Sequence, residues 1–265
     1  MKIGIIGCAG RMGRMLVAET LATDGCELAG GTERAGSDAL GQDLGGLAGA
    51  GLAGVAVTDD AAALFDAADV IIDFTVATTA RGHAELAARY GTALVLGTTG
   101  LEAATQEAVQ QASGSAAVVQ AANFSLGVNL LLGLSEQVAG ILGDDYDIEI
   151  VEMHHRHKVD APSGTALALG QSAAKGRGVD LNQVAERVRD GHTGARTRGD
   201  IGFATLRGGD VVGDHSVIFA ADGERIELVH KATSRGVFVK GAIRAAMWSA
   251  TQPPGLYSMR DVLGL

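Results

Sequence analysis

Cysteine, proline and positive charge are scarce in this chain of 265 residues. The two cysteines, Cys8 and Cys26, provide no disulfide framework, which excludes the small disulfide-stapled folds and fits a reducing compartment. The 31 acidic residues outnumber the 21 lysines and arginines, and the net charge of −10 argues against non-specific binding to nucleic acids or anionic membranes. The chain lacks a signal-like start, and no apolar run approaches a membrane span. We therefore expect a cytoplasmic protein with no nucleic-acid or membrane partner.

A cluster of basic side chains interrupts this acidic sequence at residues 154–158, in the order His-His-Arg-His-Lys. The cluster leads into the turn Pro162-Ser163-Gly164-Thr165, which is typical of a helix start. Imidazoles titrate near neutral pH and a lysine supplies a point charge, while the backbone N–H groups of a helix start bind anions. The segment therefore predicts a site that binds a polyanionic small molecule and supplies protons to it.

Two other interpretations of this segment remain open. His155 and His157 would share one face of a strand and would both be able to ligate a metal ion. No carboxylate or cysteine lies within the run to complete the shell, and the neighbouring cations oppose a divalent ion, so we expect no metal. A patch that binds nucleic acid is less favoured still, because such patches are broad and this chain is acidic.

The first residues have the pattern of a dinucleotide-binding domain. Residues 2–6 form an apolar run that predicts a strand, and residues 14–23 have the spacing of a helix. Between them lies the glycine loop Gly7-Cys8-Ala9-Gly10-Arg11-Met12-Gly13, in which small residues let the backbone approach a pyrophosphate. Its spacing is Gly-x-x-Gly-x-x-Gly rather than the commoner Gly-x-Gly-x-x-Gly, so a purely structural turn is the alternative.

Glu33 and Arg34 follow a second predicted strand, residues 27–32. Glu33 lies 20 positions beyond Gly13, where a dinucleotide-binding fold places the acid that binds a ribose. Arg34 is suited to a 2′-phosphate or to stacking on adenine, so the pair predicts use of both NADH and NADPH. An exposed pair of charged loop residues is the alternative.

Strands and helices continue to alternate as far as residue 120, which predicts a doubly wound parallel sheet with right-handed crossovers. Residues 41–54, rich in Gly, Ala and Leu, are expected to be a loop. Ligands of such sheets bind beyond the carboxyl ends of the strands, where small and hydroxyl residues leave room for a nicotinamide ring. The predicted strands are 70–75, 93–96 and 116–120, and the predicted helices are 78–90 and 101–112. The residues at their carboxyl ends are Phe74, Thr75, Gly97, Thr98, Thr99, Ala121, Ala122, Asn123 and Phe124.

The second half differs in kind, because Asp222-Gly223 is a hairpin signal between two predicted strands and implies antiparallel pairing. The predicted helices are 126–142, 163–175 and 236–250, and the predicted strands are 148–153, 201–206, 215–221 and 225–230. We expect an α/β protein: a Rossmann-like domain formed by residues 1–125 and 236–265, and an α+β domain on a mixed or antiparallel sheet formed by residues 126–235. If the strand before His154 continued, His154 and Lys158 would face one side and His155 the other.

In order along the chain, these motifs closely resemble the dihydrodipicolinate reductase family, and the likeness spans essentially the whole sequence. The basic segment 154–165 is its most specific part, whereas the glycine loop alone is not specific. The resemblance implies reduction of 4-hydroxy-tetrahydrodipicolinate, a small dicarboxylate, to tetrahydrodipicolinate with loss of water, in the diaminopimelate route to lysine. It implies NADH or NADPH as cofactor and a homotetramer assembled through the sheets of the second domain.

By motif position, the resemblance makes His154 a proton donor or acceptor and Lys158 a second proton donor. It makes His155 a contact of a substrate carboxylate, which Gly164 and Thr165 bind through the helix start. The implied cofactor site comprises Gly7, Cys8, Ala9, Gly10, Arg11, Met12, Glu33, Arg34, Gly97, Thr98, Thr99, Ala121, Ala122, Asn123 and Phe124. Two rival functions remain: a two-domain reductase of another small dicarboxylate or amino-acid aldehyde, and a non-catalytic dinucleotide sensor.

Overall fold

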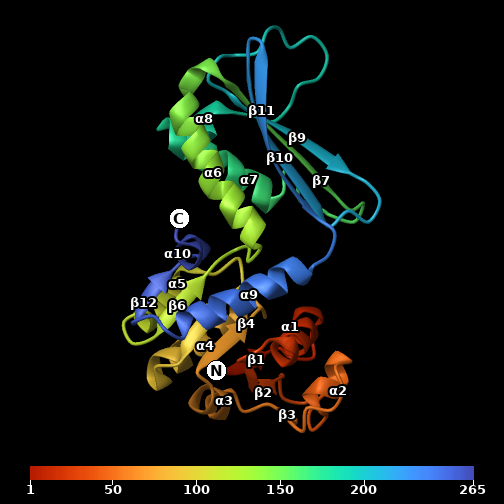
Figure 1. Ribbon diagram of the computed structural model, residues 1–265, viewed down its shortest axis with the longest axis vertical. Helices are drawn as coiled ribbons and strands as arrows, with labels where there is room; N and C mark the ends of the chain where they lie inside the picture. The colour runs from red at the N-terminus through yellow and green to blue at the C-terminus, as the bar shows by residue number, and fades with distance from the viewer. The chain divides into compact units, whose positions relative to one another are not determined.

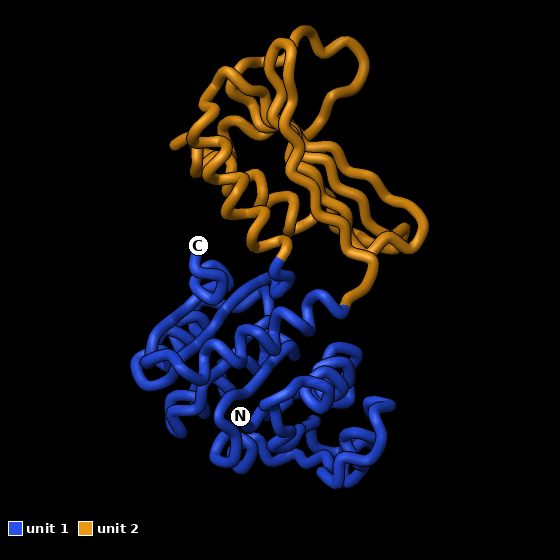
Figure 2. Tube along the Cα trace, viewed as in Figure 1, with its two compact units in different colours: residues 1–126, 236–265 blue, residues 127–235 orange.

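The computed structural model describes all residues from 1 to 265 and divides into two compact units (Figure 2). Unit 1 comprises residues 1–126 and 236–265, and unit 2 comprises residues 127–235. Each unit has its own sheet and its own hydrophobic core.

Unit 1 is built on a seven-stranded sheet in the order β12-β6-β5-β4-β1-β2-β3, and every neighbouring pair is parallel (Figure 1). The order runs outward in both directions from the β1–β4 boundary, which is the switch point where dinucleotide folds bind their ligands. The predicted doubly wound sheet is thereby confirmed. The strands are β1 Lys2–Ile6, β2 Glu27–Thr32, β3 Val57–Thr58, β4 Val70–Asp73, β5 Ala93–Leu96, β6 Ala117–Gln120 and β12 Gly255–Tyr257.

Helices cover both faces of this sheet, which explains why β4 and β5 are buried along their whole length. One core contains side chains of α1 and α9, and the other contains side chains of α3, α4 and α5. The helices of unit 1 are α1 Arg11–Ala22, α2 Leu44–Ala48, α3 Ala61–Ala67, α4 Ala77–Tyr90, α5 Ala103–Ala112, α9 Gly236–Ser249 and α10 Met259–Leu263.

The short helix α2 lies inside residues 41–54, so the expectation of a plain loop is wrong there. The Asp43 carboxylate explains the difference, because it accepts hydrogen bonds from the N–H groups of Gly46, Ala53 and Gly54 at 2.8, 3.0 and 2.7 Å. One side chain thus caps α2 and holds the segment that follows it, which offsets the low helix propensity of glycine.

Unit 2 is built on a mixed sheet in the order β11-β10-β7-β9-β8 (Figure 1). Strand β7 is antiparallel to β10 and parallel to β9, and the predicted hairpin joins β10 to β11 with Gly223 at φ +86°. Helices α6 and α7 contribute to the core on one face of this sheet. The strands are β7 Asp147–His154, β8 Ala185–Glu186, β9 Ile201–Arg207, β10 Gly213–Ala221 and β11 Glu224–Ala232, and the helices are α6 Leu126–Leu142, the 3-10 helix Gly143–Asp145, α7 Gly164–Arg177 and α8 Leu181–Val184.

Helix α6 and the 3-10 turn after it form one segment, residues 126–145, that is long and apolar enough to cross a membrane by length and composition, with a mean hydropathy of 1.4. The expectation that no apolar segment reaches this length is therefore wrong. One such helix is weak evidence for a membrane, because the core helix of a soluble protein passes the same test. Leu131 and Ala139 of α6 are buried in the core of unit 2.

Candidate active site

The glycine loop between β1 and α1 brings backbone very close to backbone. A Cβ added to Gly13 would lie 2.1 Å from the carbonyl oxygen of Gly7, so a larger residue fits there only if the loop moves. Gly7 has a φ of +70°, a left-handed conformation that favours glycine. The loop therefore lets α1 begin directly behind β1, with the N–H groups of its first turn at the carboxyl edge of the sheet. That arrangement suits a phosphate.

Glu33 contacts this loop from the end of β2. Its Oε1 accepts a hydrogen bond from the backbone N–H of Ala9 at 2.9 Å. The structure thus brings the predicted ribose-binding acid and the predicted phosphate loop together, while the side chain of Arg34 beside it is exposed.

Cys8 offers the site only its backbone. Its side chain is 1% exposed, and burial, with the charge of Glu33 as a second cause, raises the pKa of the thiol to about 12. The thiol therefore stays protonated and packs in the core rather than reacting. Gly10 and Arg11 of the same loop are exposed, and Met12 is half-buried.

The ends of β4, β5 and β6 contribute a second part of this edge, because the three strands are parallel neighbours. The rings of Phe74 and Phe124 pack with their centroids 5.1 Å apart. Thr98 is buried, whereas Thr99 and Ala122 are exposed. The predicted strand-end residues therefore gather at one edge of the sheet.

Thr98 provides a test of whether this edge fits a cofactor. Its hydroxyl is buried without a hydrogen-bond partner, and such a group costs about 1–3 kcal/mol. A ligand that brings a polar group to Thr98 would remove that cost. Asn123 lies nearby in the segment after β6, with its Oδ1 accepting from the N–H of Ser125 at 2.8 Å. These residues fit a nicotinamide dinucleotide.

A buried pair behind the glycine loop was missed by sequence reasoning. The Asp73 carboxylate is fully buried; its Oδ2 contacts His83 Nδ1 at 2.7 Å, and its Oδ1 accepts from the N–H and hydroxyl of Thr75 at 2.8 and 2.6 Å. Burial alone would raise the pKa of Asp73, but the hydrogen bonds from His83 and Thr75 lower it. Thr75 in turn contacts the glycine loop, since a Cβ on Gly7 would lie 2.7 Å from its Cγ2. The sequence did contain a signal for this pair, which was an aspartate at the end of an apolar strand.

The second group of predicted residues lies in unit 2, at the end of β7. His154 is the last residue of the strand, and its Nδ1 lies 2.6 Å from Oε2 of Glu152. Glu152 is 1% exposed. The alternation along β7 puts both side chains on the face that carries α6 and α7.

Lys158 lies in the loop that follows. Its Nζ forms an ion pair with Asp160 Oδ1 at 2.8 Å, and this contact lowers the pKa of the Asp160 carboxyl. The expected parity of His154 and Lys158 fails, because β7 ends at His154 and the chain turns, with the N–H of Lys158 donating to the carbonyl of His155 at 3.1 Å. Turn geometry rather than strand alternation therefore sets the position of Lys158.

Helix α7 begins where the sequence predicted a helix start. Ser163 is its N-cap, and its hydroxyl accepts from the N–H of Ala166 at 3.2 Å. Gly164 and Thr165 form the first turn, and a Cβ on Gly164 would meet no atom within 4 Å, so the space beside it is open. The N–H groups and the dipole of a helix of 14 residues favour an anion here.

The histidines that follow His154 are not grouped with a third side chain that could ligate a metal ion. The rings of His155 and His157 have centroids 6.3 Å apart, and the Nδ1 of His155 is buried without a hydrogen-bond partner. No three His, Cys, Asp or Glu side chains group to hold an ion.

Glu152 and two of its neighbours in this cluster were missed by sequence reasoning. Both terminal nitrogens of Arg207 in β9 donate hydrogen bonds to the Glu152 carboxylate, at 2.8 and 2.9 Å. His215 of β10 is 3% exposed, and its Nε2 lies 3.2 Å from the hydroxyl of Ser163. Burial, and then the neighbouring His154, lower the pKa of His215 to about 4, so it is neutral at physiological pH.

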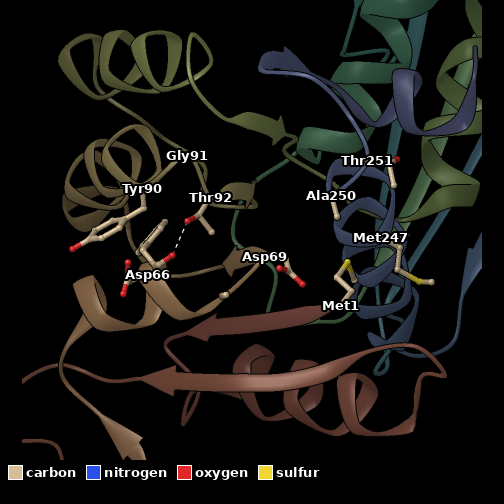
Figure 3. A pocket seen from close by; sticks show the side chains of 11 residues that line it. Met1, Asp66, Asp69, Tyr90, Gly91, Thr92, Met247, Ala250 and Thr251 are labelled. Atoms are coloured by element: carbon tan, nitrogen blue, oxygen red, sulfur yellow. Dashed lines mark hydrogen bonds between the residues drawn. The ribbon is translucent and has the colours of Figure 1, made fainter.

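A hollow of unit 1 lies away from these residues (Figure 3). It has a volume of about 560 Å³, and Met1, Asp66, Asp69, Tyr90 and Met247 are among the residues around it. Met1 and Asp69 precede β1 and β4, so the hollow is at the amino edge of the sheet. None of the predicted site residues lines it.

Comparison with known proteins gives one family over both units. The family described as "Dihydrodipicolinate reductase, N-terminus" matches residues 1–124, and "Dihydrodipicolinate reductase, C-terminus" matches residues 127–263. A relative from Ruegeria pomeroyi named 4-hydroxy-tetrahydrodipicolinate reductase is 54% identical over 263 residues, which cover 99% of this chain and 98% of that protein. A relative of the same name from Magnetococcus marinus is 53% identical, covering 100% and 98%.

Solved structures share the fold. "Dipicolinate bound Dihydrodipicolinate reductase from Paenisporosarcina sp. TG-14" superposes with a TM-score of 0.78 at 21% identity, covering 97% of each chain. An amine dehydrogenase from Mycobacterium smegmatis superposes with a TM-score of 0.59 at 14% identity, covering 97% of this chain and 94% of that one. At these identities the likeness concerns the arrangement of the chain alone.

Proposed function

This chain belongs to the dihydrodipicolinate reductase family, and we propose that its two units divide the reaction between hydride delivery and proton delivery. Membership over the full length makes the chain a pyridine-nucleotide-dependent reductase of diaminopimelate and lysine biosynthesis. It reduces 4-hydroxy-tetrahydrodipicolinate to tetrahydrodipicolinate with loss of water. The match of both family halves to nearly every residue carries this conclusion.

We assign cofactor binding to unit 1, residues 1–126 and 236–265. The glycine loop and the start of α1 hold the pyrophosphate, and Glu33 holds a ribose. The strand-end residues, among them Thr98 and Asn123, hold the nicotinamide. When bound, the nicotinamide supplies the hydride. The exposed guanidinium of Arg34 suits a 2′-phosphate, while Glu33 suits an unmodified ribose, which supports use of NADPH and NADH.

We assign substrate binding and proton delivery to unit 2. The start of α7, at Gly164 and Thr165, binds one carboxylate of the substrate through backbone N–H groups. His155 contacts a carboxylate and supplies positive charge when protonated. Between them, His154 and Lys158 supply the one proton that meets the charge developing on the ring as the hydride adds. The balance is one hydride and one proton taken up and one water released.

We propose that the chain assembles as a homotetramer joined through the sheet of unit 2. Leu206 of β9 and Val229 of β11 lie on the face of the sheet opposite to α6 and α7, and their side chains are 50% and 48% exposed. Exposed apolar side chains on a sheet face are typical of an interface between subunits. Sedimentation velocity of the purified protein tests this assembly, which predicts a mass near four times 26.9 kDa.

The assay that tests the function is oxidation of NADH and NADPH by the purified protein with freshly made 4-hydroxy-tetrahydrodipicolinate. We expect one nucleotide oxidised for each tetrahydrodipicolinate formed. Oxidation with a different small dicarboxylate or an amino-acid aldehyde but not with this substrate would favour the rival reductase. Nucleotide binding without oxidation of any of these would favour the sensor.

A further inference from the structure

One buried carboxylate connects the predicted proton donor to the predicted carboxylate-binding helix. Glu152 Oε2 lies 2.6 Å from His154 Nδ1, and Oε1 accepts the backbone N–H of Ser163, the N-cap of α7, at 3.0 Å. The two oxygens of one side chain therefore hold the end of β7 and the start of α7, the two segments whose relative position matters for the proposed function.

Arg207 completes this arrangement. Its Nη1 and Nη2 donate to Oε2 and Oε1 of Glu152, and Nη2 also donates to the carbonyl oxygen of Asp160 at 2.6 Å. Asp160 pairs with Lys158, so the loop that carries the second proton donor is attached to the same group. A buried carboxylate is tolerated when its oxygens accept hydrogen bonds from paired donors. Removing those donors strongly destabilises the folded protein.

The Glu152 carboxyl is ionised at neutral pH. Burial would raise its pKa, but the hydrogen bonds from Arg207, His154 and Ser163 lower it below the ordinary value. An ionised carboxylate at Nδ1 selects the tautomer of His154 that carries a proton there. The other nitrogen, Nε2, then meets the substrate; Gly213 lies beside it, and a Cβ on that glycine would be 3.1 Å from Nε2.

Other charged or titratable groups face this pair from the elements packed around it. They are Arg207 of β9, His215 of β10, His230 of β11, and Lys158 and Asp160 of the loop. His215 is neutral at physiological pH because it is buried, with His154 as the next cause. Glu152 is therefore the negative charge in direct contact with the imidazole of His154.

We propose that Glu152 is the positioning residue of this site: it orients His154 for proton transfer through Nε2 and fixes the start of α7 at the same time. The inference rests on the proton-delivery role of His154 in the proposed function. It goes further, because it names the group through which proton delivery and carboxylate binding are coupled.

The decisive variant is Glu152→Gln, which removes the charge but keeps an oxygen for the N–H of Ser163. We expect kcat to fall by about 10²-fold, as when a carboxylate behind a functional histidine is lost. Glu152→Asp keeps the charge, so it should retain more of the wild-type kcat than Glu152→Gln does.

A double-mutant cycle separates this inference from the proposed function. In a His154→Ala background, Glu152→Gln should lower kcat by less than about a further 3-fold, because the two groups act as one unit. A His154→Ala variant with near-wild-type kcat would overturn the proton-delivery role that the proposed function assigns to His154, and with it the present inference. A large loss in His154→Ala together with a near-wild-type Glu152→Gln would overturn only the role of Glu152.

A measurement that does not depend on turnover distinguishes the loss of this role from general damage to the folded protein. Nitrogen-15 NMR of the histidine rings in the full protein should report Nδ1 protonation at His154 in the wild type and in Glu152→Asp. In Glu152→Gln the Nδ1 tautomer should lose its preference while NADPH binding is unchanged. The same tautomer in all three proteins would contradict the proposal.

Discussion

The two units hold their candidate sites by different physical means. In unit 1 the glycine loop consists largely of backbone and small residues, and its geometry is set by contacts such as Gly13 against the carbonyl of Gly7. In unit 2 the site consists of charged side chains arranged around a buried carboxylate, Glu152. Backbone groups do not titrate, whereas imidazole and ammonium groups do. Cofactor binding should therefore depend on shape, and turnover should depend on charge and pH.

The largest effect is expected on the charged side of this comparison. Lys158→Ala should lower kcat by about 10³-fold, because the ammonium both donates a proton and attracts the dianionic substrate. NADPH binding should be unaffected, since Lys158 belongs to unit 2. Steady-state kinetics with a fluorescence titration of NADPH measures both quantities. A kcat/KM near that of the wild type would refute the assignment.

The shape-dependent side is tested by Gly13→Ala. The added Cβ would lie 2.1 Å from the Gly7 carbonyl oxygen, so the loop must move away from the phosphate position. We expect NADH and NADPH affinity to fall by about 10²-fold, as when a misplaced group disrupts a bound geometry. Gly82→Ala is the matched control: a Cβ there meets nothing within 4 Å, and in the exposed interior of α4 it should leave cofactor binding unchanged and stabilise by about 0.5–1 kcal/mol. Equal losses in both variants would show that the close crossing is not the cause.

Asp73→Asn tests the buried pair that supports the backbone-based site. The folded pKa of Asp73 lies below its ordinary value of 3.8, so the stability it contributes is complete above about pH 3.8 and is lost as the pH falls through the lower folded value. We expect the variant to lose about 1–3 kcal/mol at pH 7, because asparagine keeps one oxygen for Thr75 but takes the carboxylate oxygen away from His83. Urea unfolding at pH 7 and at pH 3 should show this difference shrinking in acid. A difference that stays constant would contradict an ionised Asp73 carboxylate.

The smallest expected effect is that of Arg34→Ala, which tests how unit 1 distinguishes NADPH from NADH. Arg34→Ala should weaken NADPH binding by about 10-fold and NADH binding much less, because a guanidinium pairs with a 2′-phosphate at an exposed position. Isothermal titration with each nucleotide measures the ratio of the two affinities. Equal losses would mean that Arg34 only stacks on adenine.

Much of the fold could be predicted because the pattern of apolar residues and turn residues along the sequence is strong. The apolar runs of β1, β4 and β5 and the hairpin at Asp222-Gly223 each carry a local signal. The short strands β3 and β12 were not predicted, since two or three residues carry no period. Helix α2 was missed because it depends on hydrogen bonds that the Asp43 carboxylate accepts from residues as far as 11 positions away.

The sequence motifs predicted which site residues lie together within each unit. They did not predict the residues that hold those site residues in place. Glu149 and Glu152 look alike in the sequence of β7, yet the alternation of the strand puts them on opposite faces. Only Glu152 meets Arg207, which lies 55 positions further along the chain. Burial and partners from distant strands decide such roles, and a local pattern does not contain them.

The central claim is that hydride and proton delivery belong to separate units, and a His154→Ala/Lys158→Ala double variant tests it most directly. NADPH affinity and turnover of 4-hydroxy-tetrahydrodipicolinate would be measured on the same preparation. We predict NADPH affinity within about 2-fold of the wild type and turnover lowered by at least about 10³-fold. Substantial turnover, or a loss of NADPH affinity that matches the loss of turnover, would contradict the account.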